Sequence, residues 1–235
     1  MRMPAAFLGA LLPLLSGCDP GAPASIQAAA SPRGFVIVNE AAKELRLNAT
    51  FHRGNAEQGT WHLLVEDTGS MAGKAIFTTD VNPAKFYASL KSLGAADANN
   101  VTPENLGEAS IETRGDLLDY LVEWKGVKEP MPITTFLAEV VPDLPSSGGR
   151  RGIEMRFGGN YTNEDASSPP CCKSGCLACL YTCSAGVTSN ARANLSLLRA
   201  EKDKHRYRLN PKVELSDGAK VRLIVRIRER VASGR

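Results

Sequence analysis

The sequence KAIFTTDVNPAKFYASLKSLGA, residues 74–95, contains a short strand pattern followed by the clearest helix signals of the chain. Asn82 is a good N-cap, because its side chain can accept a hydrogen bond from a free backbone N–H at the start of a helix. Phe86 and Leu90 recur at helical spacing, and Gly94 is placed to end the helix. We therefore expect a strand and then a helix that ends near Gly94.

Strand patterns dominate outside this segment. Apolar and polar residues alternate in residues 45–51, 117–124 and 221–227, which indicates strands with one buried face. Shorter candidates are residues 35–38, 61–66 and 153–157, with 133–141 as a short helix or strand. The elements do not follow a strict βαβ order. We therefore predict an α+β fold of mostly antiparallel strands, with one or two short helices and a cysteine-rich loop at residues 169–190.

Length and composition limit the class of protein. The chain has 235 residues, of which 43% are hydrophobic, and its formal net charge is +3. This length suits one large domain or two small ones, and we expect a single domain at residues 34–235. No apolar run reaches the roughly 18–20 residues that cross a membrane, which argues against a multi-pass membrane protein. The small net charge gives no reason to expect a nucleic-acid partner.

The first residues indicate export and a lipid anchor. Residues 1–18, MRMPAAFLGALLPLLSGC, combine an early arginine with an apolar stretch that is typical of a signal peptide and too short to span a membrane. The ending Leu-Ser-Gly-Cys resembles a bacterial lipobox. It predicts a signal peptide at residues 1–17 and a lipidated Cys18; an ordinary signal peptide with a chance cysteine is the alternative. Residues 18–33, rich in Pro, Ala, Gly and Ser, are predicted to form a flexible tether.

These features predict a location in the bacterial cell envelope. The lipid would hold the protein on the extracytoplasmic, periplasmic face of a membrane, so the membrane is the first expected partner. Asp19 directly follows the lipobox cysteine and resembles the signal that keeps enteric lipoproteins in the inner membrane. We therefore expect an inner-membrane location.

Five further cysteines lie within a short segment, a density that chance does not explain: Cys171, Cys172, Cys176, Cys179 and Cys183. The last three match the end of the bacterial ferredoxin spacing C-x2-C-x2-C-x3-C-P. The sequence departs from this spacing before Cys176, where three or four residues replace two, and Ser184 stands in place of the proline. One [4Fe–4S] cluster needs four thiolates. We predict Cys172, Cys176, Cys179 and Cys183 as its ligands, with Cys171 as an alternative first ligand.

Other uses of these cysteines stay open. Export to an oxidising compartment favours disulfides, and two bridges would leave one odd thiol. Cys176 and Cys179 have the C-x-x-C spacing of a thiol–disulfide pair but lack a βαβ context. Zinc sites usually join two separate C-x2-C knuckles, so zinc is less favoured.

The rest of the sequence offers no catalytic constellation. It has no G-x-S-x-G motif, no P-loop and no G-x-G-x-x-G motif. The three histidines lie far apart and without metal-ligand spacing: His52, His62 and His205. We interpret His62, which lies in a strand pattern, as a surface or partly buried residue and not as a ligand. We expect an electron carrier or binding module more than an enzyme, with no catalytic residue.

Two segments carry a family resemblance. Residues 90–95 form an L-x-x-L-G-A pattern at the end of the strand–helix unit, which resembles the YdjY-like domain family. Residues 175–190, GCLACLYTCSAGVTSN, resemble the ferredoxin-like cysteine stretch of some of these proteins. The resemblance extends over about residues 34–230. It implies a ferredoxin-like protein with an electron-transfer role and no established reaction.

Two main functional hypotheses follow. The first is a membrane-anchored, ferredoxin-like electron carrier with a [4Fe–4S] cluster, which would serve redox membrane proteins. The second is a non-catalytic binding or scaffold lipoprotein that is stapled by disulfides and has an unknown partner. A thiol–disulfide redox protein is a third hypothesis.

Overall fold

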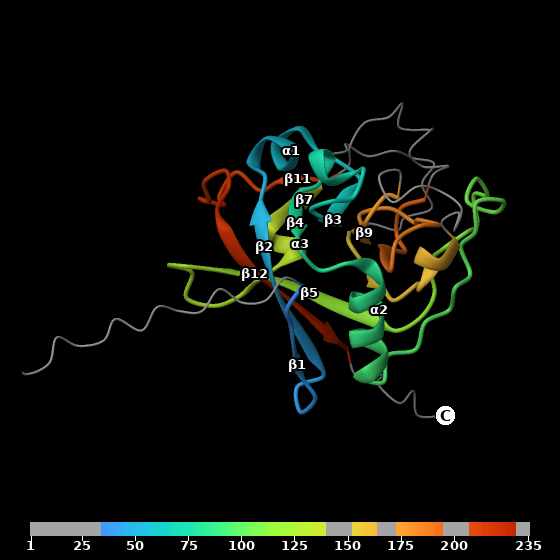
Figure 1. Cartoon of the computed structure of the whole chain (residues 1–235). Helices are drawn as coiled ribbons and strands as arrows, with labels where there is room; N and C mark the ends of the chain where they lie inside the picture. Colours follow the sequence, from blue (N-terminus) through green and yellow to red (C-terminus); the bar gives the residue numbers. More distant parts are fainter. Residues whose placement is uncertain (1–33, 140–151, 164–172, 195–206, 229–235) are drawn as a thin grey trace, which may run out of the picture. The chain divides into compact units, whose positions relative to one another are not determined.

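The computed structural model describes residues 34–139, 152–163, 173–194 and 207–228, which are drawn in colour in Figure 1. Their contacts place them in one unit of the chain. The predictions for the signal peptide, the tether and Cys18 lie outside these residues. The predictions for Cys171, Cys172 and His205 also lie outside the described residues.

Strands make up most of the regular structure. They are β1 (Val36–Asn39), β2 (Glu44–Phe51), β3 (His62–Glu66), β4 (Phe77–Thr79), β5 (Leu117–Trp124), β6 (Met131–Pro132), β7 (Leu137–Glu139), β8 (Met155–Arg156), β9 (Cys176–Cys179), β10 (Thr188–Asn190), β11 (Tyr207–Leu209) and β12 (Lys220–Ile227). The helices are α1 (Arg53–Gln58), α2 (Pro83–Ser92) and α3 (Ile133–Phe136), with 3-10 turns η1 (Ala72–Lys74) and η2 (Asn160–Asn163).

Eight strands close into a barrel in the order β2, β12, β5, β8, β10, β9, β3 and β4, and β4 pairs with β2 again. β3 and β4 are parallel, as are β9 and β10, and the other neighbours in the ring are antiparallel. β1 extends β2 outside the ring and β6 pairs with β5, while β7 and β11 form a separate two-stranded sheet. Closure pairs the ring strands on both sides and so removes the free edges that an open sheet would expose.

The predicted α+β fold class is wrong, and so is the ferredoxin-like fold that the resemblance implied. The structure is a mostly-β barrel in which about 17% of residues are helical. α2 has ten residues, whereas the other helical segments are single turns or little more. Local alternation identified the strands, but it carries no information on closure. Closure depends on β4 pairing with β2, where Phe77 lies opposite Phe51.

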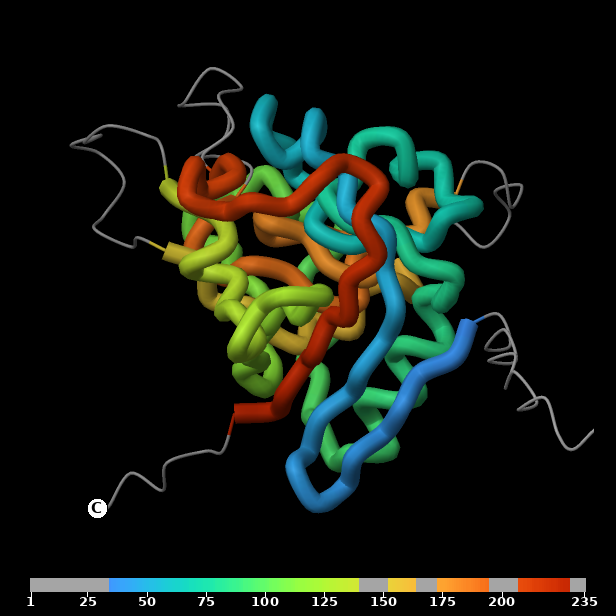
Figure 2. The backbone as a smooth tube through the Cα atoms, turned by 90° about the vertical axis from the view of Figure 1, so that its left-hand side faces the viewer, coloured from blue at the N-terminus to red at the C-terminus, as the bar shows by residue number. Residues whose placement is uncertain are grey.

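Three neighbouring long strands form the most regular part of the barrel. Leu223 in β12 lies opposite Leu47 in β2 and Val122 in β5, and all three side chains are buried. Arg222, one position away, faces outward and pairs with Glu123. A slip of one residue would turn the apolar row toward solvent, so this pattern fixes the register. Figure 2 shows the β1–β2 hairpin in blue running beside β12 in red.

The helix expected after residue 82 is confirmed as α2. Asn82 caps it by accepting a hydrogen bond from the N–H of Lys85 at 2.8 Å, and Gly94 adopts φ +83° just after its end. Phe86 and Leu90 are buried, and α2 contacts β1 and β9 (Figure 1). The helix thus covers part of the barrel wall. Among the described residues, no helix combines the length and the apolar character needed to cross a membrane.

Candidate metal centre

The irregular pairing of β3 with β9 brings three potential metal ligands together. His62 lies opposite Cys179, and Val65 lies opposite Cys176, with two shifts of register between these pairs. On a regular strand Cys176 and Cys179 would point to opposite faces, because they are three positions apart. A β-bulge inserts an extra residue and re-aims the neighbouring side chains. The bulged pairing therefore lets both sulfur atoms approach His62.

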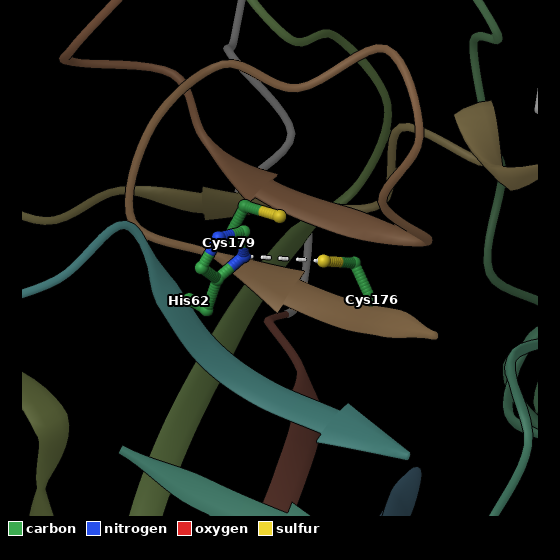
Figure 3. A group of neighbouring side chains, drawn as sticks. All are labelled: His62, Cys176 and Cys179. Carbon is green, nitrogen blue, oxygen red and sulfur yellow. Dashed lines mark hydrogen bonds between the residues drawn. The ribbon is translucent and has the colours of Figure 1, made fainter. Parts of the chain in front are cut away.

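The donor atoms of His62, Cys176 and Cys179 form a tight group. His62 Nδ1 and Cys176 Sγ are in hydrogen-bond contact at 3.3 Å. These two atoms and Cys179 Sγ all lie within 4.8 Å of one another. Figure 3 shows the imidazole reaching from β3 toward the two sulfur atoms on β9. Cys176 and Cys179 are 1% and 3% exposed, whereas His62 is half-buried, so the group is largely shielded from solvent.

Cys183 lies beside this group, in the loop that follows β9. The N–H of Ala185 donates to Cys183 Sγ at 3.4 Å, and Asn160 Nδ2 donates to the carbonyl oxygen of Cys183 at 3.0 Å. A Cβ on Gly186 would lie 3.1 Å from Cys179 Sγ and 3.5 Å from Cys183 Sγ. The missing side chain of Gly186 therefore gives the two sulfur atoms room to approach the same stretch of backbone.

A second loop holds the start of β9 in place. The N–H groups of Ser70 and Met71 donate to the carbonyl oxygens of Lys173 and Ser174, at 2.9 and 3.3 Å. Gly69 allows this close approach, since a Cβ there would lie 2.5 Å from the carbonyl oxygen of Ser174. The backbone hydrogen bonds fix Cys176 relative to β3, which carries His62.

Small apolar side chains surround the sulfur atoms. Val65 and Ala75 are fully buried and pack with Cys176 and Cys179 in a cluster separate from the main core of the barrel. Met71, Ala72 and Cys183 pack against this cluster. Such surroundings exclude water and strengthen the electrostatic interactions within the group.

Hydrogen bonding shifts the pKa values of the two buried thiols in opposite directions, whereas burial raises both. The hydrogen bond from Cys179, together with His62 and Ser174, lowers the pKa of Cys176 to about 5 against the opposing effect of burial. The same contact with Cys176, the contact with Cys183 and burial all raise the pKa of Cys179. Cys176 is therefore the natural thiolate of the group, with Cys179 as its hydrogen-bond donor.

The structure brings together three of the predicted ligands, namely Cys176, Cys179 and Cys183. All three are free cysteines. Their role as ligands stays a prediction, and Cys171 and Cys172 lie outside the described residues. The expectation that His62 is partly buried is confirmed, but His62 also lies in the candidate site, which sequence reasoning missed. The strand pattern of residues 61–66 was the available signal, because the side chain of a histidine in a strand lies next to side chains of the strand that pairs with it.

The donor set suits a thiophilic metal. Thiolates and imidazole bind zinc and iron, whereas calcium and magnesium prefer oxygen ligands. Ligands that share one tetrahedral ion lie roughly 3.5–4 Å apart, because metal–nitrogen and metal–sulfur bonds are about 2.0–2.3 Å long. The three donors of this site are gathered almost that closely. The residues present therefore fit a metal–thiolate centre.

The fold and the site define a class of protein: a mostly-β barrel with a buried cysteine–histidine group between two of its strands. The comparisons with known proteins give the family. The YdjY domain matches residues 36–226, and the chain belongs to this family. The uncharacterized protein YdjY of Escherichia coli (strain K12) is 34% identical over 132 residues, which cover 56% of this chain and 52% of that protein. The chain thus matches about half the length of this curated relative. No solved structure matches the chain.

Proposed function

We propose that this chain is an extracytoplasmic electron-transfer protein, tethered to the membrane through Cys18. Its redox centre would be an iron–sulfur cluster held by Cys176, Cys179 and Cys183, with Cys172 as the further ligand predicted from the spacing. The observation that supports the proposal is that the buried Cys176 and Cys179 and the half-buried Cys183 pack together in one cluster of the barrel. The tether rests on the lipobox pattern at residues 15–18.

The residues of the site have distinct tasks in this proposal. Cys176 has the lowered pKa that favours a thiolate, the form that binds metal. The N–H of Ala185, which lies 3.4 Å from Cys183 Sγ, stabilises charge on that sulfur. Val65 and Ala75 keep water away from the sulfur atoms. When bound, the cluster would supply one-electron transfer at a potential set by such hydrogen bonds and by burial.

Intact mass measured under non-denaturing conditions tests the proposal. The full chain would be expressed with its own signal and purified without oxygen, beside a Cys179→Ala variant. Ser189→Ala serves as the matched control, because Ser189 is also buried and lies on β10, next to β9. We expect a mass increase of four irons and four sulfides in the wild type and in the control, and its loss in Cys179→Ala.

Other masses separate the alternatives. A single iron would keep the electron-transfer role but replace the cluster by a mononuclear site, which the close grouping of the donors also fits. Bound zinc would overturn that role, since zinc has no redox chemistry. A metal-free protein lighter by two hydrogens per disulfide would overturn the metal centre and leave the scaffold and thiol–disulfide hypotheses.

A second candidate is a thiol–disulfide protein, favoured by the opposite pKa shifts of Cys176 and Cys179. In that reaction Cys176 Sγ bonds to Cys179 Sγ, and the two protons and two electrons released convert a partner disulfide into two thiols. Equilibration of the metal-free protein with glutathione buffers measures this pair. Full exchange in the wild type, abolished by Cys179→Ala, would support this candidate, and resistance to oxidation would exclude it.

A further inference from the structure

His62 approaches the sulfur atoms from a different strand than the cysteines. It begins β3, lies opposite Cys179 in the β3–β9 pairing, and places Nδ1 3.3 Å from Cys176 Sγ. The imidazole nitrogen and the two sulfur atoms therefore gather at one point, where Cys176 and Cys179 pack with Val65 and Ala75. Figure 3 shows the imidazole beside the two sulfur atoms. Any ion that contacts both sulfur atoms lies within reach of the imidazole.

His52 provides a contrast within the same barrel. It is half-buried, as His62 is, and follows directly after β2. Its Nε2 contacts the hydroxyl oxygen of Thr78 at 2.8 Å, a hard and neutral partner. The ring nitrogen of His62 contacts sulfur. Of these two histidines, only His62 therefore has its imidazole among soft metal donors.

The number of donors also matches a complete coordination shell. Structural zinc and iron–thiolate sites take four protein donors, and three cysteines with one histidine form a common set. His62, Cys176 and Cys179 form the tight group, and Cys183 lies beside Cys179.

We infer that His62 is a protein ligand of the metal centre, bonding through Nδ1 beside Cys176, Cys179 and Cys183, in the fourth position that the sequence spacing alone gives to Cys172. This inference rests on the proposed function, because it requires that the cysteines hold a metal. It adds a nitrogen donor from β3 to a set that the sequence spacing places entirely on one loop. The centre would thereby tie β3 to β9 across their bulged pairing.

Metal titration of the reduced, metal-free full chain tests the inference. Zn²⁺ affinity would be measured by competition with a chelator, and Co²⁺ would report the ligands through its visible absorption. Loss of an outer hydrogen-bond partner typically weakens metal affinity about 10–100-fold, so loss of a ligand should exceed about 100-fold. We expect this loss in His62→Ala, together with a changed Co²⁺ spectrum. His52→Ala is the matched control and should keep the wild-type affinity and spectrum.

A second measurement does not depend on the folding of a variant. Wild-type protein labelled with ¹⁵N-histidine and loaded with ¹¹³Cd²⁺ should show cadmium–nitrogen coupling at Nδ1 of His62 by NMR. An affinity loss below about 100-fold with an unchanged Co²⁺ spectrum, or absence of the coupling, would overturn the inference and reduce His62 to a hydrogen-bond partner. A wild type that binds neither Zn²⁺ nor Co²⁺ would instead overturn the metal centre itself.

Discussion

The two sides of the barrel differ in how regularly their strands pair. The long-strand side consists of β2, β12 and β5, which have eight residues each and keep one register throughout. The cysteine side consists of β3, β9 and β10, which have three to five residues and include a bulged pair and a parallel pair. Regular pairing buries a continuous apolar row, whereas irregular pairing re-aims side chains. We infer that the first side provides most of the stability and the second provides the chemistry.

Buried polar groups mark the cysteine side as well. The hydroxyls of Tyr120 and Thr188 lie 2.7 Å apart, and those of Thr113 and Ser189 lie 2.5 Å apart. Burial raises the pKa of Tyr120, so its hydroxyl stays neutral and can donate. These hydrogen bonds join β10 to β5 and to the segment before it. The two sides are therefore connected through satisfied polar contacts, which specify one arrangement of the short strands.

The largest expected effect is on the long-strand side. Phe51 is fully buried at the end of β2, and its ring lies 5.6 Å from the rings of both Phe77 and Phe136. Phe51→Ala would leave a cavity among these rings, and we expect the free energy of unfolding to fall by about 3–5 kcal/mol. Urea unfolding of the metal-free protein, followed by circular dichroism, measures this change.

Ser189→Ala is the counterpart on the cysteine side. It removes one buried hydrogen bond, so we expect a loss of about 1 kcal/mol. Equal losses for Phe51→Ala and Ser189→Ala would show that stability is spread evenly around the barrel. That result would remove the distinction between the two sides.

The long-strand side was also the part that the sequence could predict. Residues 117–124 and 221–227 alternate clearly, and each forms the strand expected from that pattern. The candidate site was predictable only in part. The cysteines are neighbours in sequence, whereas His62 lies 114 positions before Cys176. Their meeting depends on the β3–β9 pairing and its bulges, and closure depends on β4 reaching β2, neither of which leaves a local sequence pattern.

After Phe51→Ala, the next largest effect on stability is expected at a buried carboxylate. Glu44 begins β2, is 1% exposed, and pairs with Arg226 at 2.9 Å and with Arg46. Glu44→Gln removes the charge, although both arginines are partly exposed and water screens part of the loss. We expect the free energy of unfolding to fall by about 2 kcal/mol at neutral pH. Because the pair lies on the long-strand side, the midpoint of urea unfolding should shift without loss of metal.

The same pair predicts a dependence on pH. Burial raises the pKa of Glu44, but the hydrogen bonds from Arg226 and Arg46 outweigh this effect and hold the pKa below its ordinary 4.5. The unfolded chain therefore binds the proton first as the pH falls, and the folded state loses stability. The difference in the free energy of unfolding between wild type and Glu44→Gln should be largest above pH 4.5 and should shrink below it. A difference that stays constant down to the acid limit of folding would exclude this ion pair as its source.

An effect as small as that of Ser189→Ala should arise on the cysteine side, at Gly186. An added methyl group there would lie 3.1 Å from both Cys179 Sγ and the carbonyl oxygen of Thr188, so both must give by a few tenths of an ångström. We expect Gly186→Ala to cost about 1 kcal/mol in urea unfolding of the metal-free protein, since the thiol can turn aside. Gly73→Ala is the control, because a methyl group at Gly73 meets nothing within 4 Å. With metal bound the sulfur atoms can no longer turn aside, so the cost of Gly186→Ala should grow while that of Gly73→Ala does not. Equal costs with and without metal would place Cys179 outside the centre and would leave the cysteine side without its proposed chemistry.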